Sequence, residues 1–286
     1  MANEDGNRKT NIREVIRYYN KTESKLGYSL VLGGTKHFGF YSPGDNPWAF
    51  KSAMRRMEEK LANSMALPPG SMILDAGCGV GDVAINLALN HGLNVTGIDI
   101  LDFNIAEAYK RARNRGAAQS VGFLVMSYSD LGFLADRFDG VYTMETLVHA
   151  QHAESALDEF WRVLKPGGRL VLFEYSRNKD SAMPARAARV IRKINEVAAM
   201  PSFQRFEHGV LERIVFEAGF TEVKTEDITD HMIPMVRAFA IIGAIPYAIG
   251  TLTRRPAKVI NAMSAVEFMR YRRHWRYNIV TAVKPL

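Results

Sequence analysis

One stretch of this sequence combines glycines with an acidic residue in a spacing suited to holding a ligand. Residues 75–82 read DAGCGVGD, with an apolar run before them and a run typical of a helix start after them. In an open α/β sheet such a loop lies above the carboxyl end of a strand, where nucleotide-like ligands bind. A dinucleotide loop has the pattern G-x-G-x-x-G, but here Asp82 stands in place of the third glycine. Asp75, ahead of the loop, would repel a pyrophosphate and suits a ligand that carries an amino group.

A second acidic residue, Asp99, closes the next apolar segment, 18 positions after Gly81. A carboxylate at this place accepts hydrogen bonds from both hydroxyls of a ribose. A turn or a helix cap is the alternative interpretation of the same residue. Because the glycine loop precedes it, we expect Asp99 to bind ribose.

Candidates for acid–base chemistry follow two later apolar segments. Glu145 and His149 come directly after the segment 138–144, and Glu174 lies at the end of another. The carboxyl ends of parallel strands meet at one sheet edge, which places these side chains near the ligand. If the chain is helical here, the i, i+4 spacing puts Glu145 and His149 on one face. Capping the turn that follows is the alternative role for Glu174.

The elements that must position these residues alternate between strand and helix after residue 70. This alternation predicts a doubly wound α/β sheet. Proline and glycines at 165–168 are expected to end a helix and turn the chain. The predicted strands are 72–76, 94–100, 121–126, 138–144, 169–175, 221–227 and 275–283, and the predicted helices are 83–91, 105–115, 154–164 and 210–218.

Three segments fall outside the expected sheet and predict a helical cap on one catalytic domain. The first contains the glycine-rich stretch 32–41, in which packing explains His37 poorly, and the third is apolar and aromatic. The expected division is 1–65 (N-terminal cap and lid), 66–177 (ligand-binding core), 178–207 (cap), 208–229 (core helix and strand), 230–272 (apolar cap) and 273–286 (final strand).

Four motifs in order resemble those of the class I S-adenosylmethionine (SAM) methyltransferases. They are DAGCGVG at 75–81, TGID at 96–99, RFDGVY at 137–142 and RVLKPGG at 162–168, and they cover roughly residues 70–175. The resemblance implies a seven-stranded Rossmann-like methyltransferase sheet, with SAM as the cofactor and Asp75 facing its methionine end. The residues it implies for SAM are Asp75, Gly77, Gly79, Gly81, Asp99, Ile100, Ser127, Tyr128 and Met144.

One position departs from the family pattern. The family has Gly-Asp after the third strand, and its aspartate meets the adenine amine. This chain has Met126-Ser127-Tyr128 there. We expect the Ser127 hydroxyl to take the place of that carboxylate.

Flanking residues resemble the sterol C24-methyltransferase group and its relatives, which include bacterial terpenoid-tailoring enzymes of the teleocidin-pathway type. A tyrosine pair (Tyr18, Tyr19), a His-Phe pair (His37, Phe38) and the stretch from Glu145 to His149 carry the likeness. The Tyr-Glu-Tyr-Gly-Trp-Gly block of true sterol enzymes is missing. The resemblance therefore implies an apolar, prenyl- or terpenoid-bearing small molecule rather than a sterol.

Methylation of an alkene carbon fits these residue types. The alkene attacks the methyl group and leaves a carbocation, which aromatic faces stabilise, and loss of a proton or ring closure ends the reaction. The expected catalytic residues are Glu145, His149, Tyr19 and His37. The expected substrate contacts are Tyr18, Phe38, Tyr41 and Glu174. Helix packing is the alternative role for the tyrosine pair, and N- or O-methylation of a small aromatic or amine is the alternative reaction.

Charge and composition limit the kinds of binding partner that we expect for this protein. The net charge is +7 and the pI is about 9.4, yet no nucleic-acid module or metal-ligand cluster accompanies the basic residues. We therefore expect solvated basic faces, no nucleic acid and no metal. The apolar run 233–252 contains Arg237 and two prolines, so we expect cap helices and no integral membrane span. With one cysteine and no secretory signal, we expect a cytoplasmic protein, and a homo-oligomer.

Overall fold

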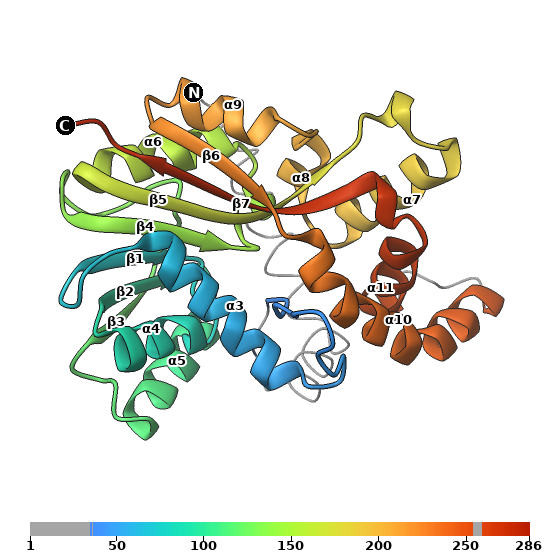
Figure 1. Ribbon diagram of the computed structural model, residues 1–286, viewed down its shortest axis with the longest axis horizontal. Helices are drawn as coiled ribbons and strands as arrows, with labels where there is room; N and C mark the ends of the chain where they lie inside the picture. The colour runs from blue at the N-terminus through green and yellow to red at the C-terminus, as the bar shows by residue number, and fades with distance from the viewer. Residues whose placement is uncertain (1–34, 36, 254–258) are drawn as a thin grey trace.

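The computed structural model describes residues 35, 37–253 and 259–286, and a seven-stranded sheet forms its centre (Figure 1). The strand order is β3-β2-β1-β4-β5-β7-β6, with β7 antiparallel to both of its neighbours. This confirms the predicted doubly wound, Rossmann-like sheet. The strands are β1 (Met72–Ala76), β2 (Asn94–Asp99), β3 (Val121–Val125), β4 (Phe138–Met144), β5 (Leu164–Arg177), β6 (Thr221–Asp227) and β7 (Trp275–Val283).

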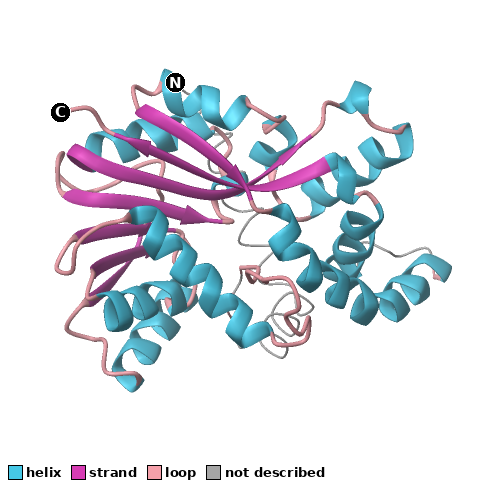
Figure 2. Ribbon diagram, in the orientation of Figure 1, coloured by secondary structure: helices cyan, strands magenta, loops and turns pink. Residues whose placement is uncertain are grey.

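Helices pack on the sheet in two layers (Figures 1 and 2). One layer consists of α3 (Phe50–Met65), α4 (Asp82–His91) and α5 (Asp102–Asn114), and the other contains α6 (Ala153–Val163) and α9 (Val210–Glu217). Because both faces are covered, β4 is buried at every position but one, and its sequence is mainly apolar. The hydrophobic core therefore runs along both sides of the parallel strands.

The start of β5 differs from the sequence expectation. The strand was expected to begin at 169, after a turn, whereas β5 begins at Leu164, directly after α6. Its pairing with β4 is irregular between Leu164 and Arg169. Backbone bonds explain the difference: Gly167 N–H donates to Lys284 O at 2.9 Å, and Lys284 N–H donates to Gly168 O at 2.9 Å. The end of β7 thus holds the Pro-Gly-Gly segment against the sheet.

The remaining helices lie beyond the carboxyl edge of the parallel strands (Figure 1). They are η1 (Leu147–His149), η2 (Asp180–Ala182), α7 (Ala185–Val197), α8 (Pro201–Arg205), α10 (Thr229–Leu252), α11 (Ile260–Arg270) and η4 (Arg272–His274). Helices η2, α7, α8 and α11, and nearly all of α10, come from the segments that the sequence predicts as cap, whereas η1 lies in the predicted core. The exact domain boundaries stay a prediction.

Helix α10 is the one described helix long and apolar enough to cross a membrane. Its first half packs into the protein, where Met232, Met235, Val236 and Ala238 are buried. A core helix of a globular protein passes the same test of length and composition. Among the described residues, the structure therefore shows no clear membrane-spanning helix.

Candidate cofactor and active site

The glycine loop joins β1 to α4 at the carboxyl edge of the sheet and is tied to β2. Gly77 N–H and Cys78 N–H both donate to Ile98 O, at 2.9 and 2.8 Å. Gly77 has φ of +108°, and a Cβ there would lie 2.6 Å from the Thr146 side chain. The Thr146 hydroxyl in turn donates to Ala76 O at 2.7 Å. The loop is thus clamped between β2 and the segment after β4.

Two glycines in the loop face different surroundings. A Cβ on Gly81 would lie 2.7 Å from the Phe123 ring and 2.9 Å from Ala108, because α4 packs closely on the sheet. A Cβ on Gly79 would meet nothing within 4 Å, although φ is +52°. The open side of Gly79 leaves its backbone accessible to a ligand, as a cofactor loop requires.

Asp99 organises this edge through three donors. Its Oδ1 accepts from Leu101 N–H at 2.8 Å, while Oδ2 accepts from Gly79 N–H at 3.0 Å and from Asn104 Nδ2 at 3.1 Å. The residue is partly exposed at the end of β2. A partly exposed carboxylate at this edge is an acceptor suited to ribose hydroxyls.

Asp75 lies beneath the loop and is 3% exposed. Burial raises the pKa of its carboxyl to about 7; the nearby Tyr142 hydroxyl lowers the pKa, and the negative charge of Asp99 raises it. Its Oδ2 has no hydrogen-bond partner among the described residues. A buried carboxyl without a full set of donors fits a ligand that brings a positively charged amino group.

The other predicted cofactor residues also lie at this edge. Ser127 and Tyr128 follow β3 and are partly exposed, and Tyr128 O–H donates to Thr146 O at 3.0 Å. Met144 ends β4 and is buried, and Ile100 packs against the cluster of cap residues around Ile194 and Met263. Their contact with the cofactor stays a prediction.

Glu145 is the centre of a network of donors. Its Oε1 accepts from Phe38 N–H at 2.7 Å and from Tyr277 O–H at 2.9 Å, and its Oε2 accepts from Tyr175 O–H. Burial raises the pKa of Glu145, while the Tyr175 and Tyr277 hydroxyls, the Phe38 amide and the charge of His37 hold it down. The backbone is left-handed, with φ of +60°. Both carboxylate oxygens are therefore engaged by the protein.

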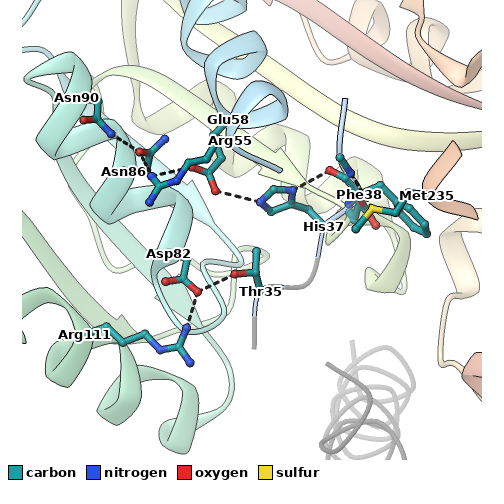
Figure 3. Close-up of polar contacts among 12 residues, drawn as sticks. Thr35, His37, Phe38, Arg55, Glu58, Asp82, Asn86, Asn90, Arg111 and Met235 are labelled. Carbon is teal, nitrogen blue, oxygen red and sulfur yellow. Dashed lines mark hydrogen bonds and ion pairs between the residues drawn. The ribbon is translucent and has the colours of Figure 1, made fainter. Parts of the chain in front are cut away.

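The residues before α3 form a strap over the cofactor loop, which we define as Thr35 and residues 37–41 (Figure 3). Thr35 O–H donates to Asp82 Oδ2 at 2.8 Å, so the residue that replaces the dinucleotide glycine anchors the strap. Phe38 binds Glu145, and Gly39 N–H donates to Met235 Sδ of α10 at 3.1 Å. The strap therefore connects the glycine loop with the cap.

His37 is a buried member of this strap. Its Nδ1 lies 2.9 Å from Phe38 O and its Nε2 lies 3.4 Å from Glu58 Oε1 on α3. Burial alone lowers the pKa of His37, but Glu58, the Phe38 carbonyl and Glu145 together raise it above the ordinary value. The imidazole thus lies between the Phe38 carbonyl and the Glu58 carboxylate, and these neighbours favour its protonated form.

The segment after β4 is not an α-helix, so the one-face arrangement of Glu145 and His149 is wrong. Only 147–149 form a short 3₁₀ turn, η1, and His149 Nδ1 contacts Ala199 O at 2.7 Å. Glu174 causes this shape, because its Oε1 accepts from Leu147 N–H at 2.7 Å and from Thr146 N–H at 3.1 Å. Glu174 thus caps the turn after β4 and not the one after its own strand.

Glu174 itself has no exposed surface. Its Oε1 also accepts from Thr143 O–H at 3.0 Å, and its Oε2 has no hydrogen-bond partner among the described residues. Burial raises the pKa of Glu174 to about 8; its backbone and hydroxyl donors lower the pKa, and the charge of Glu145 raises it. These contacts favour a positioning role over the predicted contact with substrate.

Two further predictions concern tyrosines. Tyr41 is 2% exposed, and its hydroxyl donates to Pro47 O at 3.1 Å. Burial raises its pKa to about 12, so Tyr41 serves mainly to pack the strap on α3 and α10. Tyr18 and Tyr19 lie outside the described residues.

Sequence reasoning missed several residues that build the site. Tyr175 and Tyr277 face each other across β5 and β7 and both donate to Glu145. Tyr175 could have been found from the sequence, because it lies at the end of the predicted strand 169–175. Tyr277 lies near the start of β7, and only the antiparallel direction of that strand brings it to the same edge. Glu58 could not have been identified as a site residue from the sequence, because it lies on an ordinary amphipathic helix.

Comparison with known proteins agrees with this geometry. A family model described as a methyltransferase domain matches residues 74–172. The SAM-dependent Diels-Alderase iccD of Talaromyces variabilis is 38% identical over 280 residues, which cover 96% of this chain and 95% of that protein. The sterol 24-C-methyltransferase erg6 of Schizosaccharomyces pombe is 32% identical over 77% of this chain, and the match spans 57% of that protein. The crystal structure of the [4+2]-cyclase SpnF superposes with a TM-score of 0.76 at 25% identity, covering 94% of each chain.

The fold, the glycine loop and these relatives define a class. The chain belongs to the class I SAM-dependent methyltransferase family, and its cofactor is SAM. The resemblance to the sterol C24-methyltransferase group is confirmed. Among the described residues no group of three His, Cys, Asp or Glu is arranged to hold a metal.

Proposed function

We propose that Asp75, Asp99 and the loop from Gly77 to Gly81 hold SAM, with Ile100, Ser127, Tyr128 and Met144 around it. The open face of Gly79 and the partnerless Oδ2 of Asp75 support this assignment. Bound SAM supplies a sulfonium charge and a transferable methyl group. The protein's own part is to present a dry, aromatic surface beside it, and the cytoplasm is the proposed compartment.

For the reaction we propose a SAM-dependent cyclase that closes a ring in an apolar small molecule by a [4+2] cycloaddition. In this step two new carbon–carbon bonds form from a conjugated diene and an alkene, and no atom, proton or electron leaves the substrate. The Diels-Alderase relative that matches nearly the whole chain supports this reaction class.

We base the choice of reaction on one observation, that both carboxylate oxygens of Glu145 already accept hydrogen bonds from the protein. Both its oxygens receive protein donors, and the His37 ring is already occupied by the Phe38 carbonyl and Glu58. Neither group is therefore poised to take a proton from substrate. A cycloaddition needs no base, whereas methylation of an alkene through a carbocation ends with proton loss.

The aromatic surroundings suit an apolar substrate. The Phe38 ring lies 6.4 Å from Tyr175 and 6.1 Å from Phe239, and Tyr175 lies 5.7 Å from Phe203. Phe38 and Tyr175 are only partly buried, which leaves ring surface for contact. These side chains bind a polyene by burying apolar surface and orient it with their edges and faces.

C-methylation of a prenyl- or terpenoid-bearing molecule is the second candidate. The same rings support it, because aromatic faces stabilise a carbocation by about 1–2 kcal/mol each when water is excluded. The sterol methyltransferase relatives also favour it. N- or O-methylation of a small aromatic or amine is the remaining alternative.

One assay separates these reactions. The purified protein is incubated with SAM and a synthetic substrate that contains a conjugated diene and an alkene activated by a carbonyl. We expect a cyclised product of unchanged mass and no S-adenosylhomocysteine. A product heavier by one methylene, with stoichiometric S-adenosylhomocysteine, would contradict the proposal, and the labelled methyl would then identify carbon, nitrogen or oxygen as acceptor.

A variant tests the role of the Glu145 network. Tyr175→Phe removes one donor to the carboxylate, and we expect turnover to fall about tenfold, the usual effect of losing a hydrogen bond to a charged group. SAM affinity by calorimetry should stay unchanged. Tyr271→Phe, a tyrosine between α11 and η4, is the matched control and should keep full turnover.

A further inference from the structure

The second half of α10 carries an exposed apolar surface, which we call the α10 face. Its members repeat at helical spacing on one side of the helix, which projects away from the sheet (Figure 1). They are Ile241, Ile242, Ile245, Ile249 and Leu252, with exposed fractions of 59, 47, 72, 56 and 84%. An apolar surface of this kind marks an interaction site.

From residue 231 onward, the charged residues in the sequence of α10 and directly after it are all basic. Arg237 is exposed four residues before Ile241, on the same side of the helix. The sequence from 231 to 266 contains no Asp or Glu, but it contains Arg237, Arg254, Arg255 and Lys258. No acidic side chain of the described residues is paired with Arg237 in the structure. An apolar face with basic residues before and after it in the chain matches the surface of an anionic bilayer.

A second copy of the chain fits this surface less well. A twofold contact places identical patches together, so Arg237 of one copy would approach Arg237 of the other. A bilayer with anionic headgroups supplies acidic partners and accepts the isoleucines at the same depth. We propose that the α10 face docks the enzyme on an anionic lipid surface.

The same helix connects this face to the site. In its first half Met235 accepts from Gly39 of the strap, and the Phe239 ring packs on Phe38. Docking through the second half therefore brings the strap and the aromatic side chains close to the bilayer. This inference goes beyond the proposed reaction and does not depend on it.

Vesicle sedimentation with the full chain tests the proposal. Vesicles of phosphatidylcholine alone are compared with vesicles of phosphatidylcholine and phosphatidylserine. We expect binding to the anionic vesicles that weakens as salt is added, because salt screens the basic residues. Ile245→Asp should weaken this binding about tenfold, since it removes apolar surface and adds a charge repelled by the headgroups.

Phe216→Asp is the matched control, because Phe216 is a 67% exposed apolar residue on α9. It should bind vesicles as the wild type does, and calorimetry with S-adenosylhomocysteine should show that both variants are folded. Three results would overturn the proposal: no binding by the wild type, equal binding by Ile245→Asp, or a dimer in light scattering that Ile245→Asp dissociates. If Ile245→Asp does not fold, Ile241→Asp replaces it.

Discussion

Two buried glutamates of neighbouring strands have different tasks. Glu145 meets hydroxyl and amide donors on both oxygens and presents its network to the aromatic site. Glu174 places one oxygen on the amides of Thr146 and Leu147 and leaves the other without a partner among the described residues. Burial raises the pKa of both carboxyls, and the Glu145 carboxylate has donors on both oxygens to oppose that rise.

Glu174 makes folding stability depend on pH. Its pKa is about 8 in the folded protein against 4.5 for an ordinary glutamate, so the folded state retains a proton that the unfolded state loses. Between these two values a rise in pH destabilises the protein, by up to about 1.4 kcal/mol per pH unit for one proton. Glu174→Gln removes this term and keeps the acceptor on Leu147. We expect the variant to gain stability relative to wild type from about pH 5 to pH 8.

Urea unfolding at several pH values measures this gain. Glu217→Gln, an exposed glutamate on α9, is the control and should follow the wild type throughout. A Glu174→Gln protein whose stability runs parallel to wild type across this range would show that Glu174 is already ionised.

At the scale of elements, two glycines of the loop are needed for different reasons, one for helix packing and one for access of the cofactor. Gly81 is needed for packing, because α4 approaches Phe123 and Ala108 too closely for a side chain, whereas the space beside Gly79 is open. We expect Gly81→Ala to lose about 1–3 kcal/mol of stability from overpacking, beyond the cost of its positive φ. Gly79→Ala should lose only about 1–2 kcal/mol of stability. It should nevertheless bind SAM poorly, because the added methyl group would occupy the open space through which the cofactor approaches the loop.

Chemical denaturation and calorimetry on the two variants separate these effects, and each serves as the other's control. If Gly79→Ala binds SAM as tightly as the wild type, the cofactor does not approach the loop from that side.

The same elements show what sequence can and cannot predict. The strands and the loop were found because apolar periodicity and glycine spacing act locally. The start of β5 at Leu164 was missed because Lys284, far along the chain, pairs with Gly167 and Gly168 and joins this bent segment to the sheet. The shape of 145–149 depends on Glu174, and the Tyr277 contact depends on strand direction. Local pattern carries no information on such distant partners.

At the scale of the whole molecule, ligand binding is coupled to folding through the loop, the strap and the cap. A ligand that binds only the folded chain stabilises it, by about 2.7 kcal/mol at 100 times its Kd. We expect S-adenosylhomocysteine at that concentration to raise the melting temperature by roughly 5 °C. NAD should give no shift, because Asp82 replaces the glycine that a dinucleotide requires and anchors Thr35 instead. A shift with NAD equal to that with S-adenosylhomocysteine would overturn the assignment of the loop.

The antiparallel strand β7 also sets the order in which the molecule is completed during synthesis. It lies between β5 and β6, and β6 has no other strand partner in the described sheet. Until residues 275–283 leave the ribosome, both strands expose unpaired edges, and Glu145 lacks its Tyr277 donor. The site and this part of the sheet therefore form together, once β7 has been synthesised. A nascent chain at that stage needs protection against aggregation at these edges.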